Sequence, residues 1–171
     1  MAGRKKKKFR GLLAAVLLAA VLGACAVLFL TAEKQPSKAS IYFFKNGSFI
    51  PVGRAVPQKA NPLFFAAEEL LRGPSAKERK SGYFTEIPAG TRLRHVHRQN
   101  DTVMADFSKE LEEYGGGAAR VQGLLAQIVY TLTDISGAKN VQILVEGKTE
   151  TALGGEGYII DKPLTRKDTG F

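Results

Sequence analysis

The fold is decided by residues 115–148, which read GGGAARVQGLLAQIVYTLTDISGAKNVQILVEGK. The apolar residues before Gly137 recur at the i, i+3, i+4, i+7 spacing of one helix face: Val121, Leu124, Leu125, Ile128, Val129 and Leu132. Arg120, Gln127 and Thr131 belong to the opposite, polar side of that helix. Beyond Gly137, where the helix can end, residues 140–146 alternate in polarity as a strand does. The stretch therefore predicts a helix over residues 118–134 and a strand over 140–146, and a sheet must cover the apolar helix face.

Shorter patterns on either side predict the remaining elements. Asn46-Gly47 is a two-residue hairpin signal between residues 41–44 and 49–56, and Pro51 places the second strand at an edge. A helix is expected to begin at Asn61-Pro62 and to end at Gly73-Pro74. Two further strands over 93–99 and 102–107, and a short one over 158–160, complete the order. We expect an α+β domain in which two main helices pack on one face of a small mixed β-sheet.

The N-terminus has the pattern of a membrane anchor. Residues 11–32 carry no charge over 22 positions, which as a helix is about 33 Å, enough to cross a bilayer. Six basic residues lie within residues 4–10, so the positive-inside rule keeps that end cytoplasmic and places the rest outside. The expected organisation is a basic segment (1–10), a transmembrane anchor or signal sequence (11–32), a tether (33–40), the domain (41–166) and a polar tail (167–171).

Cys25 leaves a second interpretation of this segment open. Leu22-Gly23-Ala24-Cys25 has the form of a lipobox, which would make Cys25 a lipidated N-terminus after cleavage. Residues 26–30 nevertheless continue the apolar run, whereas a lipidated end normally continues into a polar tether. The sequence therefore favours an uncleaved single-pass anchor in the cell membrane, with the domain extracytoplasmic.

Charge and composition exclude several classes of function. The formal charge of +9 falls to +3 beyond residue 32, with 19 basic and 16 acidic residues, which is not the footprint of a nucleic-acid-binding domain. A single cysteine excludes an intramolecular disulfide and any multi-cysteine metal site.

Several ordered blocks of sequence resemble the GerMN domain family. They are IYFFK (41–45), PLFFAAEELLRGPS (62–75), EIPAGTRL (86–93), VMADFSKEL (103–111) and the helix–strand block with which we began. The resemblance covers residues 41–166 and leaves room for one copy of the domain. It implies an extracytoplasmic α+β domain related to the ring-building motifs of sporulation and secretion complexes, found in sporulation and germination proteins and in envelope lipoproteins. It brings no catalytic residues with it.

The candidate site residues are few. His95 and His97 fall on one side of a strand, but a catalytic zinc site needs a third protein ligand, so we interpret them as exposed strand residues. Arg92, Arg94 and Arg98 are expected to form a stripe on the other face of that strand, which could contact an anionic partner, although a solvated sheet face is the simpler interpretation and the one we favour. Gly115-Gly116-Gly117 lacks the G-K-[ST] of a phosphate-binding loop.

The sequence thus favours a non-catalytic, membrane-anchored envelope protein that acts as an assembly or scaffolding module, needs no cofactor, and binds copies of itself or other envelope proteins. The alternative is a lipoprotein-like module that binds a cell-wall polymer or small ligand near the three arginines. Any interaction surface is expected at Arg92, Arg94 and Arg98, or on the polar side of the long helix at Arg120, Gln127 and Thr131.

Overall fold

The computed structural model describes residues 37–113, 117–153 and 157–171, all of which belong to one compact unit, residues 36–171. The expected anchor, Cys25 and most of the tether lie outside the described residues. Within the described part of the chain, no helix combines the length and the apolar character that crossing a membrane requires.

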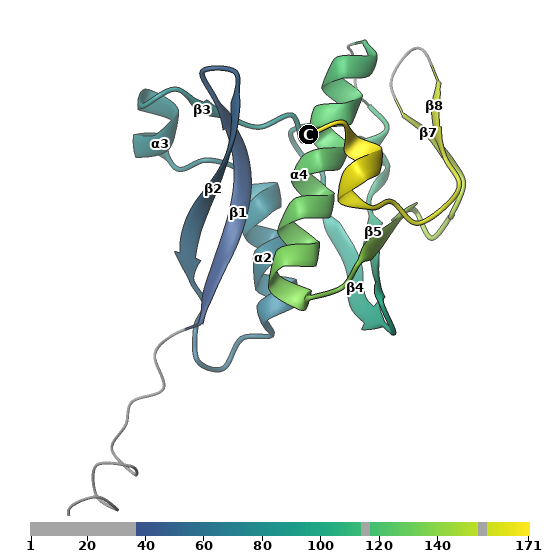
Figure 1. Cartoon of the computed structure of the whole chain (residues 1–171), viewed down its shortest axis with the longest axis horizontal. Coiled ribbons are helices and arrows are strands. Elements are labelled where there is room, and N and C mark those ends of the chain that lie inside the picture. Colours follow the sequence, from purple (N-terminus) through teal and green to yellow (C-terminus); the bar gives the residue numbers. More distant parts are fainter. Residues whose placement is uncertain (1–36, 114–116, 154–156) are drawn as a thin grey trace, which may run out of the picture. The chain divides into compact units, whose positions relative to one another are not determined.

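Within the described residues, the strands are divided among two three-stranded sheets and a hairpin (Figure 1). One sheet has the order β2-β1-β3 and is antiparallel, with β1 at Lys38–Lys45, β2 at Ser48–Ala55 and β3 at Tyr83–Phe84. The other has the order β4-β5-β6, with β4 at Leu93–Gln99 antiparallel to β5 at Thr102–Phe107, and β6 at Asn140–Val145 parallel to β5. The hairpin pairs β7 (Thr151–Leu153) with β8 (Tyr158–Ile160).

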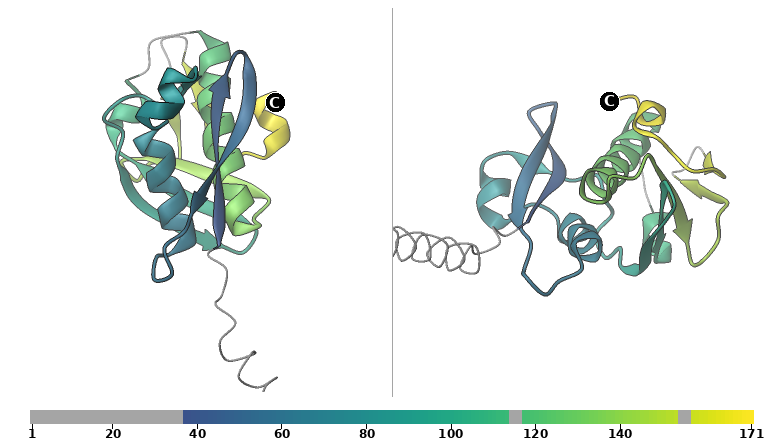
Figure 2. Two further views of the ribbon diagram at one scale, coloured as in Figure 1. Left: turned by 90° about the vertical axis from the view of Figure 1, so that its left-hand side faces the viewer. Right: turned by 60° about the horizontal axis from the view of Figure 1, so that its bottom comes forward.

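Two long helices lie between the two sheets (Figure 2). Helix α2 spans Pro62–Arg72 and helix α4 spans Ala118–Ser136, and the two pack against each other. The short α3 (Ala76–Lys80), η1 (Lys109–Leu111) and η2 (Arg166–Thr169) complete the domain. The α+β class and the two main helices are confirmed, but the expected single sheet with helices on one face is wrong: the strands form separate sheets, and the helix pair fills the space between them.

Local signals account for most of the boundaries. The side-chain oxygen of Asn61 caps α2 by accepting hydrogen bonds from the backbone amides of Leu63 and Phe64. Ser75 and Glu78 form the capping box at the start of α3. Gly137 ends α4 at φ 65°, in the left-handed region. Val103, Ala105 and Phe107 share the buried face of β5, because alternate residues of a strand point to the same face of its sheet.

Two boundaries differ from expectation. Strand β1 begins at Lys38, inside the segment expected to be a tether. The residues expected to form a tail instead fold against the domain, because η2 buries Thr169 completely and the Phe171 ring packs on Phe44 and Phe49.

Candidate functional site

The three arginines of the expected stripe each have a partner within the domain. Arg92 Nη2 lies 3.3 Å from Glu110 Oε1, and Arg94 Nη1 lies 3.2 Å from Asp106 Oδ2 and 3.4 Å from Glu146 Oε2. Arg98 donates to the backbone carbonyls of Asn100 and Ser136. These guanidinium groups therefore support turns and a helix end, and they are not aimed together at a common ligand.

A β-bulge also divides the stripe. The register of β4 and β5 shifts between Leu93 and His95, so Arg94 is the extra residue. Its side chain reaches Asp106, which lies on the sheet face away from the core residues of β5. Arg98 instead turns toward the end of α4, so the expectation of one arginine face is wrong.

A shallow hollow of about 410 Å³ reaches only the first of these arginines. It is lined by Glu68, Leu71, Arg72, Thr91, Arg92 and Leu93. The guanidinium of Arg72 pairs with Glu69, and that of Arg92 pairs with Glu110. Because both cations already face carboxylates, the hollow is a weak candidate for an anionic polymer.

The two histidines stand side by side on the exposed face of β4. Their ring centroids are 5.1 Å apart, and both residues are exposed. Among residues 37–113, 117–153 and 157–171, no three His, Cys, Asp or Glu side chains come together as metal ligands would.

The polar side of α4 is the clearest correction to the expected interaction surface. Gln127 and Thr131 are completely buried. Thr131 Oγ1 accepts from the Tyr42 amide at 3.2 Å, and Gln127 Nε2 donates to the Tyr42 carbonyl at 2.8 Å. These two side chains form hydrogen bonds with backbone groups on the part of the β1 edge that β3 does not cover. Because both are buried there, neither can contact a partner protein. Arg120 remains exposed, at 3.0 Å from Glu86.

The close approach of α4 to this edge explains why Gly123 lies on the same side of the helix, four residues before Gln127. A Cβ at position 123 would lie 3.3 Å from two ring carbons of Phe44 and 3.2 Å from Glu86 Cγ. Glycine lets the helix approach β1 closely enough for Gln127 and Thr131 to reach its backbone.

A surface cluster of aromatic rings lies at the far end of β1, and we call it the aromatic patch. Seven ring pairs with centroids 5.0 to 5.6 Å apart join its members: Tyr42, Phe44, Phe49, Phe84, Tyr130 and Phe171. Phe84 is 44% exposed and Phe171 is 50% exposed, although both are large apolar side chains. Burial and the nearby Asp134 carboxylate raise the pKa of Tyr42, so its phenol stays neutral.

Part of the aromatic patch could have been found from the sequence. The Asn46-Gly47 turn fixes the pairing of Phe44 with Phe49, which places both rings on one face together with Tyr42. Phe84 and Phe171 carry no such signal, because only the folded chain brings them to β1.

Comparisons with known proteins agree with this architecture. Residues 40–151 match the Germane family, which is described as a family of sporulation and spore germination. The spore germination protein GerM of Bacillus subtilis (strain 168) is 26% identical over 125 residues, which cover 72% of this chain and 34% of GerM. The chain thus spans about a third of the length of that curated relative.

Solved structures show the same fold. The first GerMN domain of B. subtilis GerM superposes with a TM-score of 0.62 at 26% identity, over 77% of this chain and 99% of that domain. The tandem GerMN domains of the same protein give 0.62 at 22% identity, over 80% of this chain and 49% of theirs. A protein from Clostridium perfringens described as a lipoprotein gives 0.56 at 25% identity, over 78% and 89%. Since the family match extends over more than half of the sequence, the chain belongs to the Germane, or GerMN, family of sporulation and spore germination domains.

Proposed function

We propose that this chain is a non-catalytic, membrane-anchored protein of the cell envelope whose GerMN domain binds a protein partner outside the cytoplasmic membrane. Residues 11–32 would hold the chain in the membrane, and the domain would serve as an assembly or scaffolding module in sporulation or germination. The family match supports the sporulation and germination setting, since its description names those processes and no reaction.

The observation that carries the proposal is the aromatic patch. Phe84 and Phe171 expose about half of their surface while their rings pack on Phe44, which is 6% exposed. Aromatic side chains that are half-buried on a rigid support are the typical anchors of protein–protein interfaces. The partner would be a second copy of this chain or another envelope protein with an apolar surface.

The sheet edges are poorer candidates for assembly. The backbone of Tyr42 bonds to α4, so its cross-strand neighbour Pro51 forms a non-hydrogen-bonded pair and faces the open edge of β2. Proline there removes a donor from the edge, and β4 presents charged side chains and a bulge along its own edge.

Site-specific photo-crosslinking in membranes of the native host tests the proposal. A photoreactive phenylalanine at position 84 should give a discrete heavier product, whereas the same group at Ile159, which is 61% exposed in the β7–β8 hairpin, should give none. Equal products from both positions, or monomer alone from both, would refute an assembly role for the aromatic patch.

The anchoring is tested separately on the full chain. Resistance to alkaline carbonate extraction, together with protease access to the domain from outside the membrane, is the expected result. Mass spectrometry of the mature N-terminus decides between the two interpretations of Cys25, since a diacylglyceryl group on Cys25 would exclude the uncleaved anchor.

A further inference from the structure

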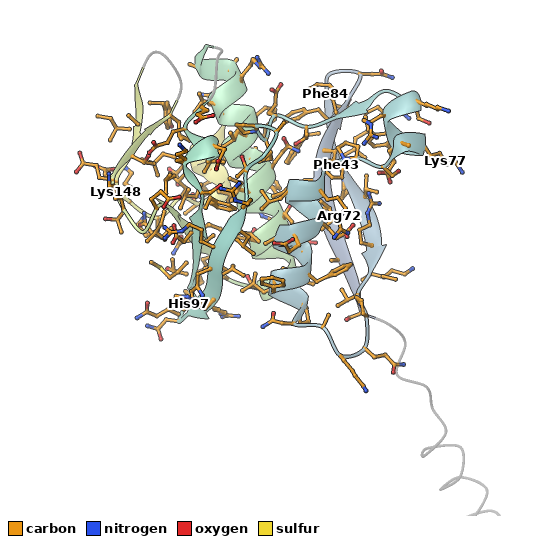
Figure 3. All side chains as sticks on the ribbon, turned by 180° about the vertical axis from the view of Figure 1, so that it is seen from behind. Phe43, Arg72, Lys77, Phe84, His97 and Lys148 are labelled. Atoms are coloured by element: carbon orange, nitrogen blue, oxygen red, sulfur yellow. The ribbon has the colours of Figure 1, made fainter. Side chains whose placement is uncertain are left out.

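The topology brings the start of the domain and several turns to one end of the molecule. Strand β1 begins at this end, and the Val56 amide at the exit of β2 donates to the Ser37 carbonyl at 2.8 Å. The turn after β4 meets the turn after α4, because the Lys139 amide donates to the Asp101 carbonyl at 2.8 Å. We call residues 37–38, 56–61, 97–101 and 136–140 the tether end. In Figure 3, His97 marks this end and Phe84 lies at the opposite end.

The tether end is strongly basic for its size. Its four segments contain four cations, Lys38, Lys59, Arg98 and Lys139, all exposed, against the single acid Asp101. Asp101 is shared between two of them, at 2.7 Å from Lys139 Nζ and 3.8 Å from Arg98 Nη2. The end therefore keeps a net charge of +3.

The opposite end has no such excess. Residues 45, 76–86, 92, 108–113, 120 and 146–150, which lie there, carry eight cations and seven acidic residues, a net charge of only +1. The positive charge of the domain is thus polarised toward the end at which the preceding chain enters.

An exposed apolar side chain follows the tether end in the first turn of α2. Phe64 is 50% exposed in the first turn of α2, three residues after Asn61. Lysines and arginines around an exposed phenylalanine form the combination that binds a bilayer interface, since the cations meet phosphates and the ring enters the headgroup region.

We infer that the tether end docks on the anionic phospholipid surface of the membrane, through Lys38, Lys59 and Lys139 with Phe64 inserted into the headgroup region. The inference rests on the proposed anchoring: four residues lie between Ala32 and Ser37, and the five Cα–Cα steps reach at most about 18 Å, so an anchor ending at Ala32 holds the tether end near the headgroups. Docking would turn a loosely tethered domain into one with a fixed orientation, with Phe84 directed away from the bilayer.

Vesicle binding of residues 36–171 tests the inference directly. This segment has its own continuous core, and the similar first GerMN domain has been solved as a separate domain. Co-sedimentation is measured with phosphatidylcholine vesicles that contain or lack one third phosphatidylglycerol, at low and at high salt. We expect binding only with phosphatidylglycerol and loss of binding at high salt, because salt screens exposed charges.

A matched pair of triple variants separates docking from a general charge effect. Replacing Lys38, Lys59 and Lys139 by glutamine should lower binding at least about fivefold, whereas replacing Lys77, Lys80 and Lys109, exposed at the other end, should change it less than about twofold. Phe64→Ser, which leaves the charge of the domain unchanged, should also lower binding to the vesicles. Thermal melting confirms that each variant is folded.

Two results would overturn the inference: no binding to phosphatidylglycerol vesicles, or an equal loss in both triple variants. Its failure is distinguishable from failure of the proposed anchoring. If the full chain resists carbonate extraction while the domain ignores phosphatidylglycerol, only the docking is wrong. Release of the full chain by carbonate would refute the anchoring instead.

The orientation has its own readout, because residues 36–171 contain no cysteine. The segment is tethered to nickel-chelating vesicles through an N-terminal histidine tag and carries a dye at Gln58→Cys or at Lys77→Cys. Energy transfer to a headgroup acceptor should rise with phosphatidylglycerol at position 58 and should not rise at position 77. The same change at both positions would contradict a fixed orientation.

Discussion

Replacing Gln127 by methionine tests whether the polar side of α4 holds the two halves of the domain together. Gln127 is fully buried and makes three hydrogen bonds. Its Nε2 donates to the Tyr42 carbonyl at 2.8 Å, while its Oε1 accepts from the Glu86 amide at 2.6 Å and from Thr85 Oγ1 at 3.2 Å. Methionine has nearly the same length but no polar partner to offer.

The magnitude follows from the backbone groups left behind. An unsatisfied buried group costs roughly 1–3 kcal/mol, and the substitution strands the Tyr42 carbonyl and the Glu86 amide. Both residues are only half-buried, so water can reach these groups in part, and methionine gains some apolar burial. We expect a loss of about 2–3 kcal/mol in the free energy of unfolding.

Urea unfolding of residues 36–171 measures this loss as a shift of the midpoint by roughly 1–2 M, with an unchanged slope. Gln122→Met is the matched control, because Gln122 lies on the same helix but is only half-buried, and it should change stability by less than about 0.5 kcal/mol. Equal midpoints for the two variants would refute the idea that Gln127 serves as the missing strand partner of β1.

Three further predictions concern the supports of this arrangement. Glu78 binds Arg54 through two hydrogen bonds of 2.8 and 2.7 Å, which lower the pKa of Glu78 from 4.5 to about 2, so its stabilisation is complete above pH 4.5 and is lost as pH falls toward 2. Glu78→Gln should therefore flatten stability against pH in that window in thermal melts, and an unchanged slope would contradict the assignment. Gly123→Leu should destabilise the domain by about 2 kcal/mol in urea because the side chain would meet Phe44, whereas stability equal to wild type would show that α4 can withdraw from β1 without loss. Pro51→Val should add a donor to the open edge of β2 and promote association seen by light scattering, and a strictly monomeric variant would count against the edge argument.

The sequence predicted what is encoded locally. The period of α4, the Asn61 cap and the Asn46-Gly47 turn each depend on residues within a few positions of one another. Such signals give elements and their limits, so the elements were largely correct. Strands β3 and β7 were missed because two or three residues show no alternating pattern; β8 is equally short but was found because Tyr158, Ile159 and Ile160 all favour strands.

Pairings between distant parts of the chain could not be predicted in the same way. Gln127 donates a hydrogen bond to the carbonyl of Tyr42, 85 residues away. No residue close to Gln127 in the sequence indicates that its side chain packs against a strand edge. Polar residues on one helix side are usually solvent-exposed, so the pattern pointed outward for Gln127 and Thr131. The bulge at Arg94 is equally invisible, and it alone moves that guanidinium to Asp106.

Two surface features now lie at opposite ends of β1, and their separation links the two proposals. The strand spans eight residues, about 26 Å, from Lys38 at the tether end to Lys45 beside the ring of Tyr83. If the basic end rests on lipid, Phe84 and Phe171 stand roughly one domain height from the bilayer, where a partner anchored in the same membrane can reach them. Docking would already restrict the orientation of the domain, so the domain would lose less rotational freedom when it binds its partner. An interface of modest area would then bind more tightly. Removing the lysines of the tether end should therefore weaken crosslinking at position 84 in membranes, although those lysines lie far from that residue. Crosslinking at position 84 that is insensitive to the lysine substitutions would show that the two surfaces act independently.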